Sequence, residues 1–204
     1  MTVRALVIAA TRALLAVPRP TAAGNRRRLR RRGESVGALV VRPPVAGEIP
    51  ALARLHVETW NATYPFVRRK PSVELREAQW REAFGRTDGS WFAFVVERPD
   101  RRLVGFAKGI RSDHPEFQGE LSKIYLLRDY QRLGLGSRLM GHVSRRFVSQ
   151  GISSMVLFAE PSNPSCGFYE ALGAERLFDD AGRFHGAYGW RDLNALARRC
   201  PIDP

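Results

Sequence analysis

Apolar and polar residues alternate with two different periods along the chain, one typical of helices and one of strands, and together they predict a mixed α/β domain that begins near Ala38. Over 49–64 the apolar residues recur at three- and four-residue steps, the spacing of one helix face. A second helix is expected over 71–84, because Pro71 stands near its start and Gly85 at its end. Strands are expected at ALVVRP and at WFAFVVE and RLVGFAKGI, the last two joined by the turn sequence RPDR.

The second half of the chain continues this mixture. ELSKIYLL predicts a strand, and apolar residues on one face predict a helix over 136–149. A strand over SMVLFA, a short helix at 163–172 and two strands at 174–179 and 184–191 complete the order β-α-α-β-β-β-α-β-α-β-β. No stretch approaches 18 apolar residues, so neither a transmembrane helix nor a membrane partner is expected.

The net charge of +13 is concentrated at the start of the chain. Residues 1–33 hold nine arginines and no acid, which leaves 24 basic and 20 acidic residues for the remainder. Such a start fits a transit peptide, a weak signal peptide, a nucleic-acid arm or residues added by an upstream start codon. We expect a disordered head over 1–37 that folding does not need, a domain over 38–197 and a tail over 198–204.

Two further sequence features do not indicate a catalytic or metal site. GESVG at 33–37 matches the nucleophile pattern of serine hydrolases, but an arginine run precedes it where a strand is required. Cys166 and Cys200 have no metal-ligand spacing, so no metal is expected. Free thiols favour a reducing compartment and a cytoplasmic location.

A glycine-containing turn separates the strand ELSKIYLL from the helix that follows. A strand, such a turn and a helix start make a phosphate site, because the first helical N–H groups lack partners and glycine lets an anion approach closely. A P-loop is excluded, since no lysine follows a glycine in this chain. A dinucleotide fingerprint is excluded too, since Leu139 stands where the third glycine belongs.

The turn itself, Gln131-Arg132-Leu133-Gly134-Leu135-Gly136, resembles the [QR]-x-x-G-x-[GA] motif of the GCN5-related N-acetyltransferases. The later block NPSCGFYEALGAE, at 163–175, is similar to that family's second signature, and the resemblance extends over about 40–193. It implies an α/β (α+β) GNAT fold: a mixed, mostly antiparallel central sheet, splayed between two adjacent parallel strands and flanked by helices. It also implies acetyl-CoA as cosubstrate and acetyl transfer to a primary amine in a ternary complex.

The resemblance implies a coenzyme site formed by the strand, the turn and the second signature. Its residues are Ile124, Leu126, Leu127, Gln131, Arg132, Leu133, Gly134, Leu135, Gly136, Ser137, Asn163 and Tyr169. A backbone N–H near Leu126, where the family's strand bulges, would polarise the thioester carbonyl.

The resemblance implies that two side chains move protons. Glu120, at the start of the strand, is the expected general base, and strand alternation would place it on one face with Ser122 and Ile124. A chain of waters is the alternative, and His114 and Glu116 are weaker candidates. By its position in the family's second signature, Tyr169 is implied as the acid for the leaving thiolate, and a phenol keeps its proton at neutral pH.

The acceptor is left open as a small amine, an amino-acid-like metabolite or a protein amine. Trp60, Tyr64 and Tyr188 are expected to line its site, and Arg68, Trp91 and His114 are further candidates. The run Arg68-Arg69-Lys70 disfavours a polycationic aminoglycoside. A silent acyl-CoA sensor and an arginine-rich nucleic-acid binder are the alternative functions, nucleic acid being the less favoured partner, and a homodimer is left open.

Overall fold

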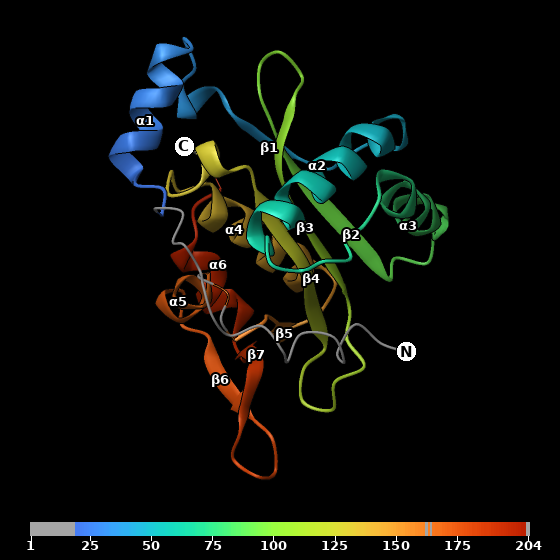
Figure 1. The fold of residues 1–204 in the computed structure, drawn as a ribbon. Helices are drawn as coiled ribbons and strands as arrows, with labels where there is room; N and C mark the ends of the chain where they lie inside the picture. Colours follow the sequence, from blue (N-terminus) through green and yellow to red (C-terminus); the bar gives the residue numbers. More distant parts are fainter. Residues whose placement is uncertain (1–18, 162, 164, 203–204) are drawn as a thin grey trace.

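The computed structural model describes residues 19–161, 163 and 165–202, and its framework is one seven-stranded sheet (Figure 1). The strands lie in the order β1-β2-β3-β4-β5-β7-β6. All neighbours are antiparallel except β4 and β5. The strands are β1 (Val40–Arg42), β2 (Trp91–Glu97), β3 (Leu103–Arg111), β4 (Gly119–Leu126), β5 (Met155–Phe158), β6 (Glu175–Phe178) and β7 (Phe184–Trp190).

Helices cover both faces of the sheet. On one face α2 (Ile49–Thr63) packs on β3 and β4, and α3 (Val73–Gly85) packs against α2. On the other face α4 (Leu135–Ser149) packs on β2, β3 and β4, with α6 (Leu193–Arg199) against it. Aromatic contacts separate the two faces: Phe106 meets Trp80 of α3, whereas Phe92 meets Phe147 of α4. The remaining helices are α1 (Ala22–Arg31), α5 (Cys166–Ala171) and the short 3-10 turns η2 (Val36–Ala38), η3 (Ala46–Glu48) and η4 (Arg128–Tyr130).

The parallel strands β4 and β5 are joined only at their beginning. Gly119 pairs with Met155 and Glu120 with Val156, and no further pair follows. The rest of β4 therefore has an open edge on the side of β5. A mostly antiparallel sheet that splays at one parallel pair is the fold expected from the sequence, and the structure confirms it.

A bulge in β4 changes which of its residues share a face. Gly109 of β3 pairs with Leu121, but Lys108 pairs with Lys123, so Ser122 is an extra residue. The expected alternation is therefore wrong beyond Leu121. Glu120 shares the α2 face with Lys123 and Tyr125, while Ile124 lies on the α4 face. The family resemblance placed the bulge near Leu126, and the structure has it four residues earlier, at Ser122.

The arginine-rich head differs from the disordered segment that the sequence suggested. Residues 1–18 lie outside the described residues, but 22–31 form α1, whose first turn is capped by the Thr21 side chain accepting from the Gly24 N–H at 3.1 Å. Leu29 is 1% exposed and Asn25 is 1% exposed, so the helix buries one face on the domain. Arginine favours helices, and residues four apart share a face, which is how this run folds without an apolar stripe.

The end of the chain is also more structured than expected. The helix α6 crosses the expected boundary at residue 197, and Cys200 after it is fully buried. The closing residues therefore belong to the packing around α4. Within the described ranges, no helix combines the length and apolar character that crossing a membrane requires.

Candidate active site

A cavity of about 810 Å³ follows the open edge of β4. It is bounded by the start of α1, the end of α2, the turn before α4, β5 and α5. Its lining includes the cofactor residues expected from the sequence at the turn and the second signature: Ile124, Leu126, Gln131, Arg132, Gly134, Gly136, Ser137, Asn163 and Tyr169. It also includes Tyr64, one of the three residues expected at the acceptor site.

The turn before α4 presents unpaired backbone donors to this cavity. Arg138 N–H donates to the Gly134 carbonyl at 3.1 Å as the first bond of the helix, so the three preceding N–H groups have no helical carbonyl to bond. Gly134 has φ of 84°, and a Cβ added there would meet nothing within 4 Å. The turn is thus an open cradle of N–H groups with the positive end of the α4 dipole behind it, which fits a pyrophosphate.

Gly136 is glycine for a different reason. A Cβ at this position would lie 3.1 Å from Phe168 Cζ, so the first turn of α4 approaches α5 closely. This close approach joins the two signature blocks of the sequence, which lie more than 25 residues apart, in one wall of the cavity.

The open edge of β4 offers donors for an extended ligand. Leu127 N–H donates to the Val104 carbonyl of β3 at 2.9 Å. Alternate N–H groups of a strand point to opposite edges, so those of Leu126 and Ile124 point toward β5, away from β3. Gln131 fixes this corner, because its Nε2 donates to the Leu126 carbonyl at 3.0 Å. The arrangement suits the amide groups of a pantetheine arm.

Three polar side chains, those of Tyr64, Asn163 and Tyr169, line the cavity. Asn163 Nδ2 donates to the Tyr64 hydroxyl at 3.3 Å, which joins α2 to the loop after β5. The ring of Tyr169 is 6% exposed and packs against Phe168, with ring centroids 5.5 Å apart. Burial raises the pKa of the Tyr169 phenol, and burial likewise raises the pKa of Tyr64. Both hydroxyls therefore hold their protons at neutral pH.

Some expected site residues do not line the cavity. The side chains of Leu127, Leu133 and Leu135 are buried in the core, so only their backbone could face a ligand. Tyr188 is wrong as an acceptor residue: it is fully buried behind Tyr169, and its hydroxyl donates to Glu170 at 3.1 Å.

Trp60 and Glu120 are also absent from the lining residues. Trp60 packs on Tyr64, with ring centroids 5.3 Å apart. Glu120 is half-buried on the α2 face, where its charge acts on Lys123.

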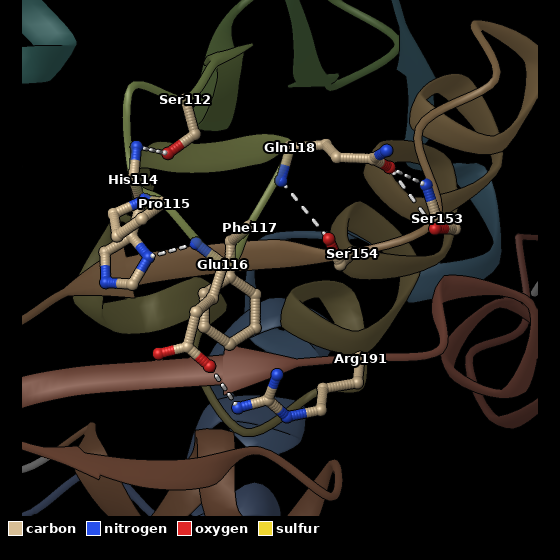
Figure 2. Close-up of a pocket in the computed structure, with 9 residues that line it drawn as sticks. All are labelled: Ser112, His114, Pro115, Glu116, Phe117, Gln118, Ser153, Ser154 and Arg191. Atoms are coloured by element: carbon tan, nitrogen blue, oxygen red, sulfur yellow. Dashed lines mark hydrogen bonds and ion pairs between the residues drawn. The ribbon is translucent and has the colours of Figure 1, made fainter.

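The weaker base candidates, His114 and Glu116, lie in a second cavity of about 550 Å³ (Figure 2). There His114 Nδ1 accepts from the Glu116 N–H at 3.1 Å, and the Glu116 carboxylate pairs with Arg191 at 2.8 Å. Figure 2 shows both side chains held by these local contacts.

Sequence reasoning missed several lining residues. Arg19, Pro20, Thr21 and Ala22 bring the start of α1 to the cavity. The remaining additions are Thr63, Leu121, Ser122, Lys123, Tyr125, Leu157, Phe158, Ala159, Ser165, Gly167 and Phe168. The four-residue spacing of Asn25 and Leu29 could have indicated α1. Nothing in the sequence indicated the bulge that turns Lys123 and Tyr125 toward α2.

Comparisons with known proteins agree with this geometry. The model of the acetyltransferase (GNAT) family matches residues 51–174. The uncharacterised N-acetyltransferase YuaI of Bacillus subtilis (strain 168) is 31% identical over 172 residues, which are 78% of this chain and 96% of that protein. A phosphinothricin N-acetyltransferase of Streptomyces viridochromogenes is 40% identical over 80 residues, 38% of this chain and 43% of that enzyme.

Among solved structures, the PaiA N-acetyltransferase of Thermoplasma acidophilum in complex with coenzyme A aligns with a TM-score of 0.57. The alignment covers 75% of this chain and 98% of that one at 20% identity, so it shows the shared fold. The family match and the relative from Bacillus go further than the fold: this chain belongs to the acetyltransferase (GNAT) family.

Proposed function

We propose that this acetyl-CoA-dependent enzyme transfers the acetyl group directly to a primary amine of a second substrate. The observation that carries the proposal is the course of one continuous cavity. It runs from the N–H cradle at Gly134, along the free N–H groups of β4, to the Tyr169 hydroxyl. Acetyl-CoA supplies an activated acyl group, and the protein has to position it, take one proton from the amine and give one to sulfur.

The chain's own residues would hold the cosubstrate at three points. The turn from Gln131 to Ser137 would receive the pyrophosphate, and the Leu126 N–H would pair with pantetheine. The Ile124 N–H, which is farther from the turn along β4, would polarise the thioester carbonyl. Asn163 would order the loop over the arm through its bond to Tyr64.

Proton transfers complete the reaction. The ammonium first loses one proton. The neutral nitrogen then forms a bond to the thioester carbon and loses a second proton as the bond from that carbon to sulfur breaks. Tyr169 would give its proton to the departing sulfur and regain one when the second proton leaves nitrogen. The amine proton would leave toward Glu120, and because Glu120 does not line the cavity, we infer that water carries it there. A primary amine with an ordinary pKa of about 10.4 is almost fully protonated at neutral pH, so this removal is the more demanding transfer.

A thiol-release assay with acetyl-CoA and a panel of primary amines tests the proposal. Phosphinothricin belongs in the panel, since the Streptomyces relative is named for it. We expect at least one amine to accelerate release and to gain the mass of an acetyl group. A protein that binds acetyl-CoA tightly while no amine, free or in a peptide, becomes acetylated would favour an acyl-CoA sensor instead.

A further inference from the structure

A group of cationic and aromatic side chains lies on the α2 and α3 side of the sheet, next to the cavity. We call it the donor cluster: Arg76, Trp80, Lys108, Lys123 and Tyr125, with His56 behind them. Lys108 Nζ lies 5.4 Å from the ring centroid of Trp80 and 5.4 Å from that of Trp91. Lys108 and Lys123 are cross-strand partners on β3 and β4, so their side chains emerge together.

The cluster holds hydrogen-bond donors without acceptors. Arg76 Nε and Trp80 Nε1 are buried, and neither has a partner among the described residues. Trp80 is 2% exposed, so water does not readily replace the missing acceptor. His56 Nδ1 is buried without a partner as well. Buried donors in native proteins are almost always paired, and an indole or guanidinium N–H can only donate.

Its positive charges also lack matching acids. On α3, Glu77 pairs with Arg81 and Glu82 with Arg86, and Arg76 Nη1 donates to the neutral Gln79 at 2.8 Å. Burial lowers the pKa of Lys108, and it lowers the pKa of Lys123 to about 8, with the charges of Lys108 and Arg76 adding to the effect. Glu120 opposes the shift of Lys123, and Glu82 that of Lys108, as the smallest contribution to each. The folded chain thus bears the cost of desolvating three cations beside one half-buried acid.

We propose that the donor cluster binds an acid group of the acceptor, so that the enzyme acetylates amines that also carry a carboxylate or a phosphonate-like oxyanion. This rests on the proposed acetyl transfer. Lys123 and Tyr125 belong both to the cluster and to the cavity lining, so an acceptor can reach the thioester with its amine while its acid group faces the cluster. An oxyanion beside Lys123 accepts from several donors at once, and it also faces the positive charges of Lys108 and Arg76 that act on Lys123.

The phosphates of coenzyme A are the competing occupant, and their place in the cavity is different. Two arginines line the cavity together with the N–H cradle at Gly134: Arg132 of the same turn, and Arg19 just before α1. The donor cluster adjoins the cavity at β4, beyond the free N–H groups that suit pantetheine. Saturating coenzyme A in the experiments therefore keeps the added anion away from the phosphate turn.

Paired acceptors test the inference by kinetics. Each pair consists of an amine with an acid group and its neutral analogue, such as an amino acid and its carboxamide, or 2-aminoethylphosphonate and ethylamine. We expect kcat/KM to be at least tenfold higher for the acid member of the preferred pair. Arg76→Gln should reduce that ratio at least fivefold while the neutral amine keeps its rate. Arg81→Gln, an exposed arginine on the same helix paired with Glu77, is the control.

A binding measurement separates the two proposals, because it does not require turnover. With coenzyme A saturating, methylphosphonate and acetate are titrated while the intrinsic tryptophan fluorescence is followed, to which Trp80 and Trp91 contribute. We expect a saturable change for at least one anion in the wild type and in Arg81→Gln, and its loss in Arg76→Gln. If the protein binds an anion but acetylates no amine, the proposed function is contradicted and the anion site is supported. Acetylation that favours neutral amines, or an absent fluorescence response, would overturn the anion site.

Discussion

Asn25 and Gln131 are joined across more than a hundred residues of sequence: the Asn25 Nδ2 donates to the Gln131 carbonyl at 2.8 Å. The same amide donates to the Arg128 carbonyl at 2.9 Å. Arg28 and Arg32 pair with Asp129 between those two carbonyls, at 2.8 and 2.6 Å. The helix α1 therefore holds the backbone that leads into the pyrophosphate turn, although it lies outside the part matched by the family model.

Asn25→Asp should weaken this support with little change in shape. A carboxylate cannot donate, so both carbonyls lose their partner and face a negative charge. We expect a loss of about 1–3 kcal/mol in the free energy of unfolding and coenzyme A affinity lowered by about tenfold, if the turn loosens at a cost of roughly 1.4 kcal/mol. Chemical denaturation and calorimetric titration measure the two effects.

The exposed Arg27 on the same helix supplies the control, as Arg27→Ala. If Asn25→Asp binds coenzyme A as tightly as this control does, α1 is packing alone and does not organise the turn. A chain beginning at Ala38 should lose stability as well, because Leu29 and Asn25 are both buried. This replaces the expectation, from the sequence, that the head is dispensable.

The turn itself is tested at Gly134, where two substitutions separate backbone strain from charge. Asparagine and aspartate both tolerate a positive φ better than other residues do, and a Cβ has open space at this position. Gly134→Asp also places a negative charge against the pyrophosphate. We expect Gly134→Asn to retain most of the affinity for coenzyme A, and Gly134→Asp to bind at least tenfold more weakly than Gly134→Asn by calorimetry. Equal affinities of the two variants would place the phosphates elsewhere.

Glu120→Gln tests the proposed base. The neutral isostere keeps the shape beside Lys123 and removes the proton acceptor, so we expect turnover to fall by about 10²–10⁴-fold with coenzyme affinity unchanged. Glu116→Gln is the matched control, since that carboxylate pairs with Arg191 in the second cavity. A turnover loss below about threefold at neutral pH would exclude Glu120 and leave a chain of waters as the route.

Features that depend on a few adjacent residues could be predicted from the sequence, whereas features that depend on strand pairing could not. The phosphate turn was predictable because glycine chemistry at Gly134 and Gly136 acts over a few residues. The face of Glu120 was not, because the bulge at Ser122 arises from pairing with β3, and one extra residue exchanges the two faces. The donor cluster also needs a register, that of Lys108 against Lys123. The arginines of α1 concealed a helix whose buried face consists of only Asn25 and Leu29.

The buried imidazole of His56 should make stability depend on acidity. Burial lowers its pKa to about 2, whereas an unfolded chain takes up the proton near 6.5. Because the unfolded state then binds more protons, stability is full above about pH 6.5 and falls as the pH drops below it. Between pH 7 and 4.5 this site should account for about 2–3 kcal/mol.

His56→Leu should therefore flatten the loss of stability between pH 7 and 4.5, as measured by urea unfolding at both values. His185→Gln is the control, because that ring is exposed beside Asp179. An unchanged slope in His56→Leu would show that other groups cause the acid sensitivity.

Tyr169→Phe tests the proposed acid and has a matched control next to it. The Tyr169 hydroxyl forms no hydrogen bond with another described residue, and its ring lines the cavity.

Removing a single donor from a dry site costs about 2.7–4 kcal/mol when the developing charge is strong. A thiolate is a fair leaving group, so we expect roughly 1–3 kcal/mol, about 5- to 150-fold in turnover. Coenzyme affinity and melting temperature should change little, because no hydrogen bond among the described residues is lost. Tyr188→Phe removes a hydroxyl that bonds Glu170 outside the cavity, and it should keep its turnover. A Tyr169→Phe enzyme that melts many degrees lower yet turns over as fast as Tyr188→Phe would show that Tyr169 packs the core and does not protonate sulfur.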